Sequence, residues 1–225
     1  MAAVTEPASG VPVVVRLGNA DDAEAAARLH AELITDGFLS ALGPRFLRRL
    51  YRRVALSADS FLLMAEGHDV VGANGHDVVG DGRTAGFLAG ALDLGALYRR
   101  FVVHDALLAA VVSLPELLGS WRLAWETLRH GTGGSRADSG GPAGAELLSM
   151  AVDPGWRGQH VGSLLVEGFL DELVRRGAGA AQVVVGAENA AAIALYRQSG
   201  FAPDQSFELH RGTVSLLMRR PAGPA

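Results

Sequence analysis

The residues best suited to chemistry follow an apolar run in the C-terminal half of the chain. The run Leu147–Val152 ends at the turn signal Asp153-Pro154-Gly155, and the chain restarts at Arg157–Gly162. An apolar-periodic helix is expected from Val161 to Leu173. The free N–H groups and dipole of a helix N-terminus attract phosphate, and small residues let it approach closely. No Gly-Lys-Ser/Thr follows, and the spacing is not GxGxxG. The stretch therefore predicts a site that holds a pyrophosphate without cleaving it.

Two motifs carry a family resemblance. Arg157-Gly-Gln-His-Val-Gly162 resembles the acetyl-CoA motif of the GNAT (general N-acetyltransferase) superfamily, Arg/Gln-x-x-Gly-x-Gly/Ala. The segment Asn189–Phe201 resembles the second signature of that family, Asn-x-x-Ala-x-x-x-Tyr-x-x-x-Gly-Phe. The resemblance covers Ala145 to about Arg220. It implies acetyl-CoA as co-substrate, with no tightly bound cofactor and no metal.

His160 departs from the family pattern, because glycine usually stands at this position. A side chain is tolerated there if φ is negative, as in the first turn of a helix, and we expect that conformation.

The resemblance also implies where acetyl-CoA lies. Two central parallel strands, Glu146–Asp153 and Ala180–Ala187, are expected to splay apart around it. The backbone of the first strand would pair with the pantetheine arm through Met150, Ala151 and Val152. The amides after the turn would hold the pyrophosphate, namely those of Arg157, Gly158, Gln159, His160, Val161, Gly162 and Ser163. The side chain of Arg157 would add a charge-assisted contact.

One face of the second signature helix completes the expected cofactor site. Asn189 and Tyr196 are two helical turns apart, and the small Ala192 between them lets the cofactor approach. Asn189 would bond the pantetheine arm or cap its own helix, and both roles can coexist.

Tyr196 and Glu146 are the predicted catalytic residues. Tyr196 would protonate the departing CoA thiolate as general acid, with core packing as the alternative. Val184 stands where some family members carry a glutamate, so the predicted base is Glu146, with a water relay as the alternative. Strand alternation predicts Glu146, Leu148 and Met150 on one face. If that face is the acceptor side, Glu146 reaches the amine; otherwise it is a strand-edge carboxylate in solvent.

Three other side chains are weaker candidates. His30 and His104 are interpreted as surface or core residues, and Glu188 is assigned to a helix N-terminus.

The composition of the chain excludes several classes of function. The chain has 225 residues, 49% hydrophobic and 20% charged, which predicts a single domain with a sizeable core. A net charge of −4 argues against a nucleic-acid surface. Cysteine and lysine are both absent, which excludes thiolate nucleophiles, Cys-type zinc sites and Schiff bases. Acetyl transfer should therefore be direct, within a ternary complex. No signal peptide or transmembrane pattern is present, and a cytoplasmic location is expected.

The predicted fold class is α/β, with a GNAT-like mixed central sheet, splayed central strands, helices on both faces and a helical insert. The other expected elements are strands at Pro12–Leu17, Ser60–Glu66 and Thr84–Asp93, a helix capped by Asn19 or Asp21, a loop at Thr35–Pro44, a helix at Arg45–Leu56, and a closing hairpin of Phe207–Leu209 and Thr213–Met218.

Two segments interrupt this pattern. Gly67–Gly72 recurs as Gly75–Gly80, and its two His-Asp pairs are interpreted as a duplicated hairpin end rather than a metal site. Residues 95–130 predict two helices that pack on the body and shape the acceptor pocket, with a lid or a membrane-facing patch as alternatives. Residues 131–144 are low in complexity and predict a flexible linker.

These observations predict an N-acetyltransferase that moves an acetyl group from acetyl-CoA to a primary amine of a small molecule, conceivably an amino sugar. The alternatives are a non-catalytic acyl-CoA-binding or regulatory module of the same fold, and a protein or peptide N-acetyltransferase. Acceptor contacts are expected from Phe38-Leu39, from the Arg45–Leu56 helix and from the insert. A homodimer is left open.

Overall fold

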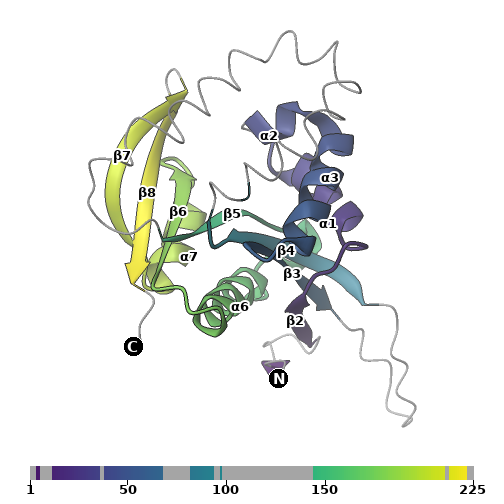
Figure 1. Ribbon diagram of the computed structural model, residues 1–225. Helices are drawn as coiled ribbons and strands as arrows, with labels where there is room; N and C mark the ends of the chain where they lie inside the picture. Colours follow the sequence, from purple (N-terminus) through teal and green to yellow (C-terminus); the bar gives the residue numbers. More distant parts are fainter. Residues whose placement is uncertain are drawn as a thin grey trace.

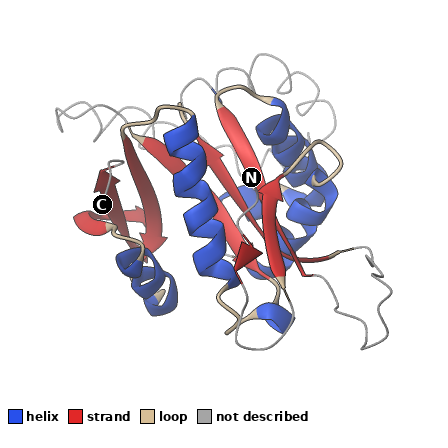
Figure 2. Cartoon of the chain, turned by 90° about the horizontal axis from the view of Figure 1, so that it is seen from below, coloured by secondary structure: helices blue, strands red, loops and turns tan. Residues whose placement is uncertain are grey.

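The computed structural model describes residues 4–5, 12–35, 38–67, 82–93, 97, 144–210 and 213–221. In these ranges the chain forms one eight-stranded mixed sheet in the order β1-β2-β3-β4-β5-β6-β8-β7, with helices on both faces (Figures 1 and 2). The strands are β1 (Val4–Thr5), β2 (Val13–Leu17), β3 (Ser60–Gly67), β4 (Arg83–Ala91), β5 (Ala145–Val152), β6 (Ala180–Gly186), β7 (Ala202–His210) and β8 (Thr213–Pro221). The helices are α1 (Ala23–Leu33), α2 (Phe38–Ala41), α3 (Gly43–Leu56), α6 (Val161–Arg175) and α7 (Ala190–Gln198), with a 3-10 turn, η1 (Pro154–Trp156). The predicted α/β class, with a mixed sheet and helices on both faces, is confirmed.

The sheet separates two hydrophobic cores because successive strand residues point to opposite faces. On β3, Phe61 and Leu63 pack against α6, whereas Leu62 and Met64 pack against α1 and α3. We call these layers the α6-side core and the α3-side core. The helix predicted at Arg45–Leu56 is present as α3, and Tyr51 is its largest fully buried side chain.

The sheet opens between its two central strands. The parallel strands β5 and β6 pair at only three positions, Ala145 with Ala181, Glu146 with Gln182 and Leu147 with Val183. Beyond Leu147, β5 stays paired with β4 on its other edge, and β6 stays paired with β8. The predicted splay is therefore present, and Figure 1 shows the two strands diverging into what we call the fork.

A β-bulge changes the side-chain pattern of β5 at the fork. Ala89 of β4 opposes Ser149, but the next residue of β4, Gly90, opposes Leu147, so Leu148 is an extra residue on β5. Leu148 packs in the α3-side core, whereas Met150 packs in the α6-side core. The prediction that Glu146, Leu148 and Met150 share a face is therefore wrong for Met150, because the bulge shifts the alternation by one residue.

Several local predictions near the N-terminus are also corrected. The segment expected as a loop at Thr35–Pro44 contains α2 and the first two residues of α3. The N-cap of α1 is Asp22 rather than Asn19 or Asp21. The insert, the linker and the Gly67–Gly80 repeat lie outside the described residues except for Leu97, Gly144 and Gly67.

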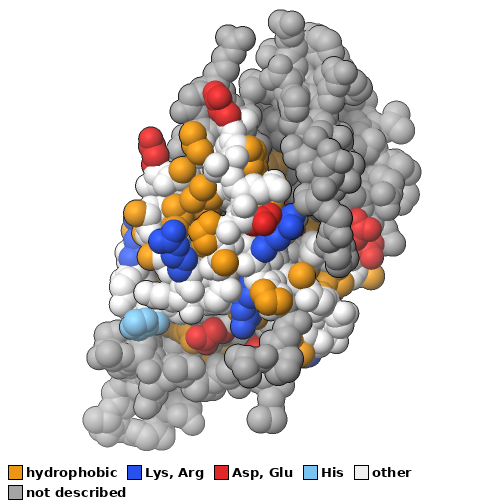
Figure 3. Space-filling model, turned by 90° about the vertical axis from the view of Figure 1, so that its left-hand side faces the viewer, with side chains coloured by type: hydrophobic (Ala, Val, Ile, Leu, Met, Phe, Trp, Pro, Cys, Tyr) orange, Lys and Arg blue, Asp and Glu red, His pale blue; other side chains and the backbone are white. Residues whose placement is uncertain are grey.

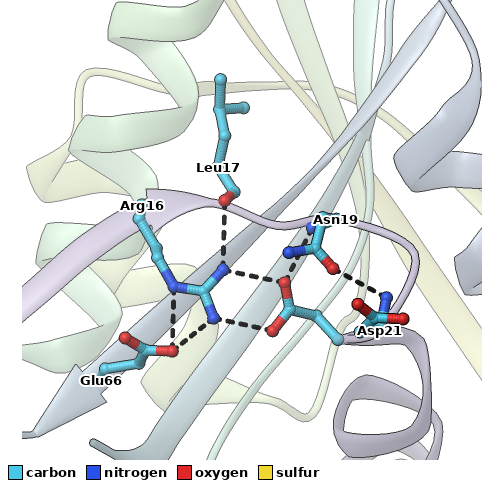
Figure 4. A network of polar contacts seen from close by, with 6 residues as sticks. Arg16, Leu17, Asn19, Asp21 and Glu66 are labelled. Carbon is cyan, nitrogen blue, oxygen red and sulfur yellow. Dashed lines mark hydrogen bonds and ion pairs between the residues drawn. The ribbon is translucent and has the colours of Figure 1, made fainter.

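The carboxylate of Asp22 joins an ion-pair network that ties β2, β3 and the start of α1 together (Figure 4). Arg16 donates from Nη1 and Nη2 to the two Asp22 oxygens at 2.8 and 2.7 Å, and from Nε to Glu66 at 2.9 Å. The Asn19 amide also donates to Asp22, at 2.7 Å. The hydrogen bonds from Arg16 are the main cause that lowers the pKa of Asp22.

Replacing Asp22 with asparagine is expected to lower the free energy of unfolding by about 1–2 kcal/mol at pH 7, allowing for partial solvent exposure. The folded pKa of Asp22 lies below that of an unfolded aspartate, near 3.9. The ionised carboxylate therefore stabilises the fold fully above about pH 5, and this contribution is lost as the pH falls below about 4. Urea unfolding of both proteins between pH 3 and 7 should show the difference shrinking in acid. Asp21→Asn is the matched control, because Asp21 is an exposed neighbour; an equal loss in both variants would contradict the network's role.

The described surface mixes charges. Figure 3 views the side of the molecule on which β7 and β8 lie, where acidic and basic side chains are interspersed with hydrophobic ones. Within the described ranges, no helix is long and apolar enough to cross a membrane.

Candidate functional site

The turn between β5 and α6 is held rigidly by local contacts. The Asp153 carboxylate accepts from the Gly155 amide at 2.9 Å. Trp156 is buried, and its indole lies so close to Gly67 that a Cβ there would come within 1.8 Å of the ring. The Leu164 amide donates to the His160 carbonyl at 3.0 Å in the first turn of α6. The amides just before Leu164 precede the regular helical bonding pattern, as at any helix start, and can face an anion.

His160 adopts a left-handed conformation, with φ of 60°. The expectation of a negative φ is therefore wrong. The chain reverses into α6 at this residue, and Gly158, two positions earlier, also has a positive φ. Histidine is among the residues that tolerate this region, although its Cβ is strained there.

Replacing His160 with glycine is expected to raise the free energy of unfolding by about 0.5–1 kcal/mol. Glycine removes a left-handed strain of about 1–2 kcal/mol, and the greater entropy of its unfolded chain offsets part of that gain. Denaturant unfolding measures the difference. Gln159→Gly is the control. Because Gln159 has no positive φ, glycine relieves no strain there and should lower the free energy of unfolding. A His160→Gly protein no more stable than the parent would argue against strain at this residue.

The N-terminal end of α6 packs against α7. A Cβ on Gly162 would lie 3.2 Å from the Leu195 side chain, which explains the small residue there. Asn189 caps α7, and its side-chain oxygen accepts from the Ala192 amide at 3.1 Å. The predicted capping role of Asn189 is confirmed, and its contact with pantetheine stays a prediction.

Tyr196 is buried in the α6-side core. Its ring lies 5.8 Å from the ring of Phe201, in a tilted arrangement. Burial raises the pKa of Tyr196 to about 12, so the phenol stays protonated throughout the physiological range. The core packing weighed from the sequence is present, and the packed ring gives the hydroxyl a fixed position from which to donate a hydrogen bond.

A pocket of about 90 Å³ lies on the other face of the sheet, in the α3-side layer. Three of the lining side chains are polar, those of Tyr51, Glu146 and Ser149. The other lining residues are aliphatic: Leu39, Leu50, Val54, Ala89, Leu97 and Leu148. Glu146 pairs with Gln182 on β6, one position before the last pair that precedes the fork. Its Oε2 accepts a hydrogen bond from the Gln182 side chain at 2.8 Å. Glu146 thus lies on the α3 side of the sheet and lines a pocket there. Leu39 and the predicted acceptor helix both contribute to this lining.

The structure groups the predicted site residues in two places, along the fork and at the pocket. The free edge of β5 at Met150–Val152 leads directly into the Arg157–Ser163 turn, with α7 beside it, whereas Glu146 lies toward the pocket. Three contributors were missed from the sequence: Trp156, Tyr51 and Ser149. Tyr51 carried only the signal of an apolar helix face. His104 lies outside the described residues.

No group of three or more His, Asp or Glu side chains in the described ranges is arranged to hold a metal ion.

The whole fold resembles solved acetyltransferases. A GCN5-related N-acetyltransferase from Kribbella flavida aligns with a TM-score of 0.59 at 17% identity, covering 93% of this chain and 97% of that one. The ribosomal-protein-S18-alanine N-acetyltransferase from Escherichia coli aligns with a TM-score of 0.55 at 18% identity, covering 95% and 96%. In sequence, residues 110–201 match the model of the acetyltransferase (GNAT) family. The match to the GNAT family model thus covers part of the chain, and the whole fold is that of solved acetyltransferases.

Sequence identity to curated acetyltransferases is higher, but the aligned segments are short. A [ribosomal protein bS18]-alanine N-acetyltransferase from Escherichia coli is 47% identical over 57 residues, which are 25% of this chain and 38% of the relative. A mycothiol acetyltransferase from Beutenbergia cavernae is 43% identical over 61 residues, 27% of this chain and 20% of the relative. The matched part thus spans well under half of the relatives' length. The family match at residues 110–201 also excludes α2 and α3, which border the pocket.

Proposed function

We propose that this protein is an N-acetyltransferase of the GNAT family that transfers an acetyl group from acetyl-CoA to a primary amine in a ternary complex. The observation that carries the proposal is the fork between β5 and β6. The N-terminus of α6, which suits a pyrophosphate, borders the fork. The pocket lined by the Glu146 carboxylate lies on the α3 side of the sheet.

The fork suits the extended arm of acetyl-CoA. The edge of β5 beyond Leu147 is released from β6, so backbone groups of Met150, Ala151 and Val152 can pair with pantetheine as an added strand. The following turn offers amides to the pyrophosphate, and exposed Arg157 adds a positive charge. A solved acetyltransferase from Salmonella typhimurium with a TM-score of 0.56 contains acetyl-CoA.

The catalytic groups would act from opposite faces of the sheet. Glu146, on the pocket side, accepts a proton as the amine nitrogen attacks the thioester carbonyl carbon. The C–S bond then breaks, and Tyr196, on the α7 side, donates a hydrogen bond to the departing sulfur, which ends as a thiol. The products are the acetylated amine and free CoA.

The pocket favours an amine next to a small apolar substituent, because its volume is about 90 Å³ and most of its lining is aliphatic. We propose a small-molecule amine as the acceptor. The second candidate is the N-terminal amine of a protein, and the names of the bS18-alanine relatives favour it. Both acceptors present a primary amine.

The test is release of CoA thiol from acetyl-CoA with isobutylamine, D-glucosamine and an alanine-initiated tripeptide amide. Thiol release that depends on one acceptor supports the enzyme and selects the acceptor class. Saturable acetyl-CoA binding without thiol release from any of the three would overturn the proposal and favour a non-catalytic acyl-CoA-binding module.

A further inference from the structure

A chain of four hydrogen bonds in the α3-side layer runs from the Ile34 carbonyl to the pocket. The Ser40 hydroxyl donates to the Ile34 carbonyl, and His30 Nε2 lies 3.2 Å from Ser40 Oγ. His30 Nδ1 lies 2.5 Å from the Tyr51 hydroxyl, which lies 2.8 Å from Ser149 Oγ. His30 and Tyr51 are fully buried, and Tyr51 and Ser149 line the pocket.

The backbone carbonyl at one end sets the direction of every bond. The carbonyl of Ile34 can only accept, so it takes the single proton of Ser40. Ser40 Oγ must then accept from His30, which places the imidazole proton on Nε2. The neutral ring therefore accepts at Nδ1 from the Tyr51 hydroxyl. The Tyr51 oxygen in turn accepts from the Ser149 hydroxyl.

Burial keeps this order in place at neutral pH. Burial lowers the pKa of His30 to about 4, so the ring is neutral, and burial also raises the pKa of Tyr51 above its ordinary value. Because the Ser149 hydroxyl donates its proton to the Tyr51 oxygen, Ser149 can only accept a hydrogen bond from a ligand in the pocket. The pocket therefore offers two hydrogen-bond acceptors, Ser149 Oγ and the Glu146 carboxylate.

We propose that Ser149 is a specificity-determining residue for the acceptor, and that Tyr51 and His30 are positioning residues that hold its oxygen as a hydrogen-bond acceptor. A neutral primary amine has two N–H bonds and one lone pair. One N–H goes to Glu146, the second goes to Ser149, and the lone pair is left to attack the thioester carbonyl. A secondary amine cannot satisfy both oxygens while it attacks. This inference rests on the proposed function and adds selection of primary over N-methylated amines.

The test compares the panel amine that gives turnover with its N-methyl derivative. Ser149→Ala should lower kcat/KM for the primary amine by about 10–30-fold and for the N-methyl amine by less than about threefold, with KM for acetyl-CoA unchanged. Ser149→Thr keeps the oxygen and should restore most of the discrimination. Tyr51→Phe should reproduce the effect, and adding it to Ser149→Ala should cost little more. Ser60→Ala is the matched control, because Ser60 is a buried serine that does not line the pocket and whose hydroxyl donates to the backbone carbonyl of Val54.

Equal losses with both amines in Ser149→Ala would overturn the proposal. A second readout does not depend on turnover: ¹⁵N NMR of the imidazole reports its tautomer. We expect His30 protonated at Nε2, and a proton at Nδ1 would overturn the order of the chain. If the wild-type protein releases no thiol with any amine, the proposed function fails, and the tautomer still decides whether the chain of hydrogen bonds is oriented as argued.

Discussion

Replacing Tyr196 with phenylalanine is expected to lower kcat by about 10²–10³-fold while the dissociation constant for acetyl-CoA changes less than about twofold. The phenylalanine ring keeps the packing against Phe201 and the rest of the α6-side core. Only the hydroxyl is lost, and the hydroxyl is the group proposed to face the departing sulfur. Single-turnover acetyl transfer measures kcat, and calorimetric titration measures acetyl-CoA binding.

The pKa of Tyr196 also indicates how the residue acts. Its pKa is about 12, and a thiol such as that of CoA has a pKa near 8.5. Full proton transfer to the thiolate would then be uphill by about 5 kcal/mol. Tyr196 therefore stabilises the developing charge as a hydrogen-bond donor, and water completes the protonation. Because the phenol ionises only near pH 12, activity should not decline through this residue between pH 7 and 10.

Phe201→Leu is the control for altered packing. It changes the neighbour of the tyrosine ring and leaves the hydroxyl, so kcat should stay within a few-fold of the parent. If Tyr196→Phe retains full turnover, Tyr196 is a core residue only, and another donor serves the sulfur.

The parts of the site that were predictable from sequence depend on local signals. The turn at Asp153–Gly155, the start of α6 at Val161 and the cap at Asn189 are each set by residues a few positions apart. The fork was expected from the family resemblance and is present. Helix and strand periodicity likewise predicted α3 and β3 within one or two residues.

The missed features depend on the partner strand or on distant segments. The bulge at Leu148 arises from the pairing of β5 with β4, and nothing in the composition of β5 shows that one residue is extra. The contact of Tyr51 with Ser149 joins residues 98 positions apart. The sign of φ at His160 is set by the way the turn enters α6, which residue spacing does not report.

Replacing Glu146 with glutamine is expected to lower kcat/KM for the amine by about 10²–10³-fold, because the variant loses the carboxylate that would take the proton of the attacking amine. Glutamine keeps the size of the side chain and can still accept from Gln182, so the geometry at the fork should persist. Steady-state thiol release with varied amine gives kcat/KM, and thermal unfolding checks that stability is retained.

Two further variants separate proton acceptance by Glu146 from a structural role. Glu146→Ala enlarges the pocket, and added formate should restore part of the activity by supplying a carboxylate in the vacated space. Glu167→Gln removes an exposed carboxylate from the middle of α6 and should leave kcat/KM unchanged. If Glu146→Gln keeps activity within about threefold of the parent and formate does not stimulate Glu146→Ala, the amine loses its proton to water instead. In that case the Glu146 carboxylate acts by attracting the cationic acceptor into an otherwise apolar pocket, and KM rather than kcat should carry the effect of its removal.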